Sequence, residues 1–150
     1  MGKHIQIPNY EPKKQNRFVV TLPETFDLKE WTIRSIDLPS FDMFSGWKPM
    51  NIQFVDPICP STSQRLWNLY CAITKTKDVL IPDYDNLCTL VDEGFEIGIE
   101  LIDPAGKVVS VWKLSGCKIV EMDWGSLDYA ESDVLRCGMK IKPREVYLSY

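Results

Sequence analysis

The chain has 150 residues, of which 45% are hydrophobic and 25% are charged, and this size and composition fit one ordinary globular domain. No apolar run approaches the roughly 18 residues that a membrane span requires, and the first eight residues lack a signal peptide's apolar core, so we expect neither a membrane protein nor a secreted precursor. The net charge of −4 argues against a protein that coats nucleic acid by contacting its phosphates.

The first half of the chain predicts an extended arm followed by short strands. Residues 1–16 are polar and contain two prolines, so we expect an N-terminal arm that needs a partner to become ordered. Alternating apolar residues then predict strands over 17–22, 31–36 and 50–54, each closed by a proline or an Asp-Pro pair. The segment 41–49 between the last two strands reads as a loop.

One helix is predicted over residues 62–74. Ser61 and Gln64 form the sequence pattern of a capping box. Beyond it, apolar residues recur at helical spacing and predict one buried face, which is made of Leu66, Leu69, Tyr70 and Ile73 with Trp67 beside it. Residues 76–92 read as a long loop because they contain Pro82 and an Asp-Tyr-Asp-Asn cluster.

The second half predicts more strands. Residues 95–101 alternate strictly between apolar and polar or glycine, and Asp103-Pro104-Ala105-Gly106 predicts a type I turn that leads into a returning strand over 107–114. Further strands are expected over 117–122 and 134–141, the last extending past Pro143. We therefore predict a single domain over 1–150 that is mainly β, an antiparallel sandwich or barrel with one flanking helix.

The sequence offers no set of residues for catalysis, metal binding or a cofactor, and we predict that the protein is not an enzyme. The five cysteines form no Cys-x-x-Cys pair and His4 is the only histidine, which leaves a zinc site or a nucleophilic pair unsupported. Glu96 and Glu100 would lie about 13 Å apart on one strand face, too far to flank one scissile bond. Whether the cysteines stay reduced or form disulfides between subunits remains open at this stage.

Negative charge and aromatic residues are unevenly distributed. Positions 78–106 contain eight acidic residues and no lysine or arginine, which predicts either a solvated face or a surface that repels phosphate. The five tryptophans are more than a small core can hide, so we expect some at subunit contacts. Trp47 is the first candidate for such an anchor, with Trp112 and Trp124 as further candidates, whereas Trp67 is expected in the core.

The order of these elements resembles the tail tube proteins of contractile-tailed bacteriophages and their baseplate relatives. The resemblance is carried by the opening strand 16–22, the strand that closes in Ile36-Asp37-Leu38-Pro39, the single helix with Trp67, and the C-terminal half. That half matches most densely, in 96–101, the turn 103–107, 112–117, 122–129 and 132–133. The stretch 44–61 has no clear counterpart in the family pattern.

The resemblance implies hexameric rings that stack into a hollow tube inside a contractile sheath, with strands of neighbouring subunits joined edge to edge. It also implies that DNA passes through without specific binding, which suggests that Glu96 and Glu100 line the channel; an outer or sheath-facing surface is the alternative. The arm 1–16 and the loop 40–60 are the candidates for contacts between rings. The expected partners are copies of the chain, the sheath protein, and baseplate or tape-measure proteins, in a virion assembled in the host cytoplasm.

Two alternatives remain open. In the first, the chain forms one ring, as a baseplate, tube-initiator or tail-terminus protein of the same fold. In the second, it is a small β-barrel that binds an apolar ligand, with Trp31 and Trp112 lining the pocket.

Overall fold

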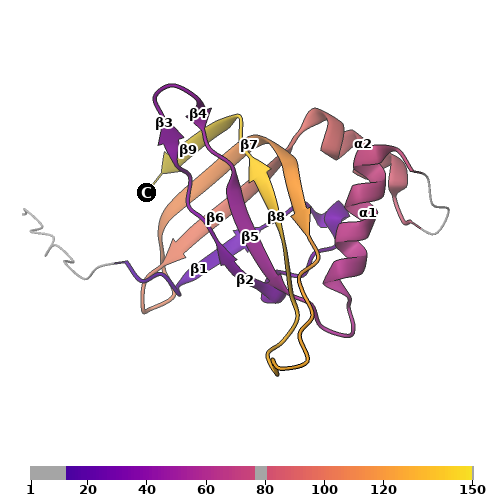
Figure 1. Cartoon of the computed structure of the whole chain (residues 1–150). Coiled ribbons are helices and arrows are strands. Elements are labelled where there is room, and N and C mark those ends of the chain that lie inside the picture. Colours follow the sequence, from indigo (N-terminus) through magenta and orange to yellow (C-terminus); the bar gives the residue numbers. More distant parts are fainter. Residues whose placement is uncertain (1–12, 77–80, 150) are drawn as a thin grey trace, which may run out of the picture.

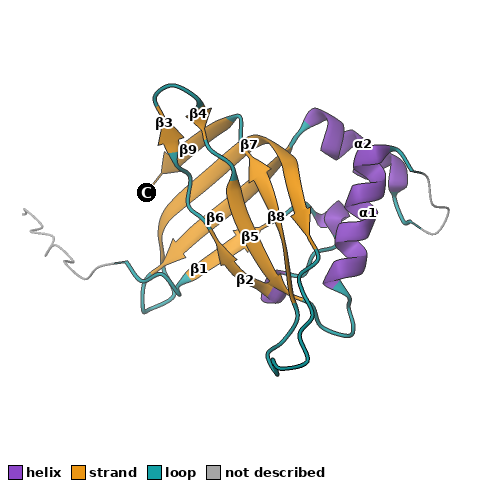
Figure 2. Cartoon of the chain, viewed as in Figure 1, coloured by secondary structure: helices purple, strands orange, loops and turns teal. Residues whose placement is uncertain are grey.

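A computed structural model describes residues 13–76 and 81–149, and seven of its strands form one long antiparallel sheet that folds back on itself (Figures 1 and 2). The strand order is β1-β6-β7-β8-β5-β2, with β9 also paired to β7. The bounds of these strands are β1 Phe18–Thr21, β2 Ile33–Ile36, β5 Met50–Val55, β6 Phe95–Ile102, β7 Val108–Asp123, β8 Arg136–Lys142 and β9 Glu145–Ser149.

The two halves of this sheet meet at β7. The first part of β7 pairs with β6 and β9, whereas its second part pairs with β8. We call β1, β6, the first part of β7 and β9 sheet A, and the second part of β7, β8, β5 and β2 sheet B. The buried side chains of both sheets belong to one apolar cluster, which includes Ile97, Ile99 and Leu114 of sheet A and Ile52, Phe54 and Ile141 of sheet B. The expected mainly β sandwich is confirmed.

Two helices lie at one end of the sandwich (Figure 2). Helix α1 spans Thr62–Thr74, as predicted, and the Ser61 hydroxyl accepts a hydrogen bond from the Gln64 amide at 3.2 Å. Its buried face is rotated from the predicted one, because Cys71 and Ala72 are buried with Leu66 and Leu69, whereas Tyr70 and Ile73 remain more than one-third exposed. Trp67 was expected in the core and is instead about half exposed.

The second helix corrects the expectation of a loop over 76–92. Helix α2 spans Tyr84–Glu93 and packs on α1, where the Tyr84 hydroxyl donates to the Cys71 carbonyl at 3.5 Å, and its Leu87 and Val91 are buried in the core cluster. It ends at Gly94, which has a positive φ of 97°, a backbone conformation that favours glycine. A Cβ atom added at Gly94 would lie 3.0 Å from the Cα of Gly116 in β7, so a larger residue would collide with that strand. This contact between two glycines fixes the chain that leads from α2 into β6.

Three other expectations also need correction. Strands expected separately over 107–114 and 117–122 are one strand, β7, because Gly116 with φ of 63° bends the chain without ending it. The chain after Pro143 is a distinct strand, β9, that pairs with β7. The segment 41–49 is a hairpin of β3 (Phe41–Asp42) and β4 (Gly46–Trp47), with two short 3-10 helices, Glu24–Phe26 and Glu30–Thr32, earlier in the chain.

The predicted turn between β6 and β7 is present. The Gly106 amide donates to the Asp103 carbonyl at 3.0 Å, as a type I turn requires. One Asp103 carboxylate oxygen also accepts from the amides of Ala105 and Lys107 at 3.0 and 2.8 Å. These bonds fix the register of the hairpin that carries Glu96 and Glu100.

Candidate assembly surfaces

Glu96 and Glu100 lie on the outward face of sheet A. The residues Phe95, Ile97 and Ile99 between and beside them are buried, so the glutamates point away from the core. The Glu96 side chain is 66% exposed, and its Oε2 lies 4.0 Å from the Nζ of Lys113 on β7, a separation at which a solvated pair contributes little. The strict alternation predicted for this strand is therefore confirmed, and the face that it forms is acidic.

Both outer edges of sheet A are unpaired among the described strands. At one edge β1 pairs only with β6, and at the other edge β9 pairs only with β7. Since each neighbouring pair in the order β1-β6-β7-β9 is antiparallel, the two edge strands run in opposite directions. Copies of the chain placed side by side can thus continue the sheet in antiparallel pairing, which removes the exposed edges.

The three candidate tryptophan anchors are all partly buried. Trp112 and Trp124 pack against the core cluster of their own chain. Trp47 packs edge to face on Phe41 across the β3–β4 hairpin, with ring centroids 5.0 Å apart. The structure does not bring the three together on one surface patch, and the most exposed tryptophan is Trp31, at 67%.

The β3–β4 hairpin presents large apolar side chains that the sequence reading did not single out. At its tip Met43 is 85% exposed and Phe44 is fully exposed. The Asp42 carboxylate accepts hydrogen bonds from the Phe44 and Ser45 amides at 2.8 and 3.2 Å, and these bonds hold the pKa of Asp42 below its usual value. The tip is therefore a structured turn that holds two apolar side chains in water. Such a feature is typical of a protein contact.

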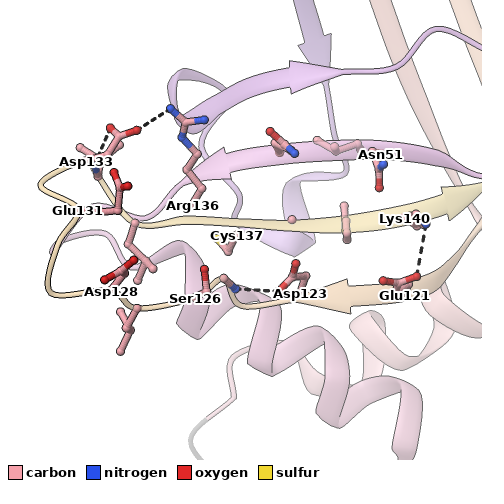
Figure 3. A pocket seen from close by; sticks show the side chains of 18 residues that line it. Asn51, Glu121, Asp123, Ser126, Asp128, Glu131, Asp133, Arg136, Cys137 and Lys140 are labelled. Atoms are coloured by element: carbon pink, nitrogen blue, oxygen red, sulfur yellow. Dashed lines mark hydrogen bonds and ion pairs between the residues drawn. The ribbon is translucent and has the colours of Figure 1, made fainter.

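A hollow of about 700 Å³ lies between the outward face of sheet B and the loop 124–135 (Figure 3). Strands β5, β7 and β8 form its floor, and the loop forms its wall. Within the loop, Asp133 pairs with Arg136 at 3.0 Å, and the Gly125 amide donates to the Asp123 carboxylate at 2.8 Å. The Nε of Arg136 is buried, and no described residue accepts its hydrogen.

The loop 124–135 is fixed to helix α1 by aromatic contacts. The Trp124 Nε1 donates to the Ser63 carbonyl at 3.2 Å, and the Trp124 ring lies 6.2 and 6.3 Å from the rings of Trp67 and Tyr70. These contacts explain why Trp67 is not in the core, because its ring packs on the loop instead. Beyond this attachment Leu127 and Tyr129 are almost wholly exposed.

A second hollow, of about 980 Å³, lies at the open mouth of the sandwich between the edge strands β1 and β2. Phe18, Ile33, Ile36 and Leu101 give it an apolar lining, and Trp31 lies at its rim. The ligand-barrel alternative placed Trp31 and Trp112 in one pocket. Trp31 lines this hollow, but Trp112 is not among its lining residues.

The described residues hold no group of three histidine, cysteine, aspartate or glutamate side chains that could bind a metal ion. In the same residues, no helix is long and apolar enough to cross a membrane. The five cysteines are unbridged within the chain: Cys71, Cys117 and Cys137 are buried, Cys88 is partly buried and Cys59 is exposed. The expected arm lies mostly outside the described residues, which begin at Lys13.

No protein-family model matches the sequence, and a comparison with curated proteins finds no match. Solved structures of the same fold are found. The tube-terminating cap of the anti-feeding prophage superposes with a TM-score of 0.58 at 17% identity, covering 96% of this chain and 95% of that one. A chain of the six-fold symmetrised baseplate of the same particle gives a TM-score of 0.60 at 12% identity, covering 94% and 97%. A chain of the sheath-tube complex of an extracellular contractile injection system, PVC, gives 0.57 at 13%, covering 93% of each.

At these identities the likeness establishes the fold, and it does so over nearly the whole length of each chain. The expected resemblance to tail-tube-like proteins is confirmed at this level.

Proposed function

We propose that this protein is a structural tube subunit of a contractile tail or injection system, in which copies join edge to edge into rings and the rings stack. The observation that carries the proposal is sheet A, whose two edge strands, β1 and β9, have no further partner among the described strands and run in opposite directions. A ring closes such a sheet on itself and leaves no edge exposed. The shared fold with tube, cap and baseplate chains supports the same role.

The hollow between β1 and β2 also supports edge-to-edge pairing of neighbouring copies. The apolar hollow between β1 and β2 adjoins the β1 edge, and the opposite edge strand, β9, carries Leu148 with 43% of its surface exposed. Pairing of β9 from one copy with β1 of the next places this leucine beside the hollow. Burial of apolar surface then adds to the strand hydrogen bonds.

In this ring the outward face of sheet A lines the channel. Glu96 and Glu100 then face the lumen, and their charge repels the phosphates of a DNA that must slide without binding. The finer proposal is therefore a phage tail tube that conducts DNA, surrounded by a sheath protein and capped by baseplate proteins. A single ring at the baseplate or the tail terminus is the second candidate.

The first experiment is negative-stain electron microscopy of the purified protein over a concentration series. We expect closed rings with six-fold end views at low concentration, and hollow tubes at high concentration. A protein that stays monomeric at every concentration and binds an apolar probe such as a fatty acid would overturn the ring and favour the ligand-binding barrel.

The channel assignment needs its own test. Rings carrying Glu96→Lys and Glu100→Lys should retain a DNA oligonucleotide in a gel-shift assay, because the lumen becomes basic. The matched control carries Glu24→Lys and Glu93→Lys, which change the net charge equally at exposed sites away from sheet A and from both hollows. If both pairs of substitutions retain DNA equally, or if neither does, sheet A does not line the channel.

A further inference from the structure

The two ends of sheet B carry different features. The β3–β4 hairpin precedes β5 at the Met50 end, where Met50 pairs with Ile141 of β8. The loop 124–135 lies at the other end, where Val55 pairs with Arg136. Five residue steps along β5 separate these ends by about 17 Å. Figure 1 shows the hairpin and the loop at opposite ends of the molecule.

The charges of these two ends are opposite. Residues 123–136 contain four acidic residues and one arginine, Arg136, which pairs with Asp133, whereas residues 141–144 contain two basic residues and no acid. At the hairpin end Lys142 stands directly opposite Lys118 on β7, and no described residue forms an ion pair with either lysine. Two like charges facing each other across strands are unfavourable unless an anion neutralises them.

The apolar features of the two ends are also complementary. The hairpin presents Met43 and Phe44 on a tip that is already structured, so little conformational entropy is lost when it docks. The hollow at the other end is open, and Leu127 and Leu135 contribute to its lining. The tip thus offers apolar side chains, and the hollow offers a recess beside apolar groups.

We propose that these ends are the two halves of one head-to-tail interface between copies of this chain. The hairpin tip of one copy enters the hollow under the loop 124–135 of the next, and the loop's acidic residues face Lys118 and Lys142. Because one chain carries both halves, the contact repeats without limit, as a heterologous interface does. The inference rests on the proposed function, and it favours a repeating tube over a single ring.

A charge exchange tests the proposal. Reversing the basic half with Lys118→Glu and Lys142→Glu should leave rings intact and reduce tubes by at least about tenfold, since like-charge contacts at an interface cost several kcal/mol. Adding Asp128→Lys and Glu131→Lys to the same chain gives the loop two lysines that can pair with the two new glutamates. This four-fold variant should form tubes again.

The apolar half has a matched pair of variants. Phe44→Ser should abolish tubes and retain rings, whereas Ile58→Ser, at an equally exposed isoleucine in the loop before α1, should leave tubes unchanged. Ring formation and circular dichroism verify folding in each case.

Three results would overturn the inference. The first is that the Lys118→Glu, Lys142→Glu chain forms as many tubes as the wild type, and the second is that the four-fold variant forms rings but no tubes. The third is that the wild type itself forms rings but no tubes at every concentration. In the last case the ring of the proposed function stands and only the repeating stack fails. Absence of wild-type rings would instead overturn the proposed function.

Discussion

Two strand glycines on the outward faces of the sandwich should respond in opposite ways to the same added methyl group. Gly98 on β6 and Gly138 on β8 are both partly buried, and neither has a positive φ, so alanine fits the backbone of each. A Cβ at Gly138 would lie 2.8 Å from the Ile52 carbonyl oxygen on β5, a contact that requires the backbone to move. In the described part of the chain, a Cβ at Gly98 would meet only the Thr21 side chain, at 3.8 Å.

The magnitudes follow from these distances. Overpacking of this kind costs about 1–3 kcal/mol, and in a chain of this size each kcal/mol corresponds to about 2–4 °C, so Gly138→Ala should lower Tm by about 2–12 °C. Gly98→Ala should instead be neutral or stabilise by up to about 1 kcal/mol, because alanine reduces the freedom of the unfolded chain.

Thermal unfolding followed by circular dichroism measures both effects. The protein concentration is chosen so that the wild type and the two variants have the same sedimentation coefficient, because the three proteins are then compared in the same state of assembly. The comparison is sensitive because each variant serves as the other's control. Equal Tm values for the wild type and Gly138→Ala, or an equal loss in both variants, would refute the reasoning from the close backbone contact at β5.

Three further predictions concern the hairpin, the loop and the thiols. Because hydrogen bonds lower the pKa of Asp42 below 3.8, the tip should keep its amide NMR shifts from pH 7 to 5 and lose them only as the pH falls through that lowered pKa; loss near pH 6 would contradict this. Trp124→Phe keeps an aromatic ring but removes the hydrogen bond to α1, so urea unfolding should show a loss of about 1 kcal/mol, with faster amide exchange in the loop 124–135. Iodoacetamide at pH 8 should label the exposed Cys59 first in the folded protein, since burial raises the pKa of Cys117 to about 12 and of Cys137 to about 11; mass spectrometry that finds early labelling of those two would disprove their burial.

The helices show where sequence patterns were sufficient and where they were not. Helix α1 was predictable to the residue because Ser61 caps it and its apolar residues recur at helical spacing. Helix α2 carries Leu87, Leu90 and Val91 at the same spacing, but it follows Asp83, which adopts φ of 51° and forms no side-chain cap bond. Turn-forming residues at its start therefore masked the helix, which packing on α1 stabilises.

The strands were also predictable in part from the sequence. The alternation of apolar and polar residues predicted β1, β5 and β6 and the outward direction of Glu96 and Glu100. This works because successive side chains of a half-buried strand point alternately toward the core and toward solvent. Ser115-Gly116 looks like the end of a strand, yet Gly116 only bends β7, which continues because β8 is available to pair with it.

The assembly surfaces depended least on local sequence. Segment 41–49 has no strand alternation, and only the folded chain shows that Asp42 organises its tip and exposes Phe44. The hollow is formed by residues from three strands and a loop that are far apart in the sequence. Its position relative to the hairpin follows from the register of β5 against β8, which no spacing within either strand encodes.

The continuity of β7 has a mechanical consequence. One unbroken backbone of 16 residues belongs to both halves of the sandwich, and its hydrogen-bonded neighbours are β6 and β9 at one end and β8 at the other. A force that pulls or pushes sheet B along β7 therefore reaches sheet A through the covalent backbone of β7 and through the hydrogen bonds between its neighbouring strands. It does not have to pass through the softer layer of side chains between the two sheets. Each subunit should move as one stiff body when it is pushed lengthwise.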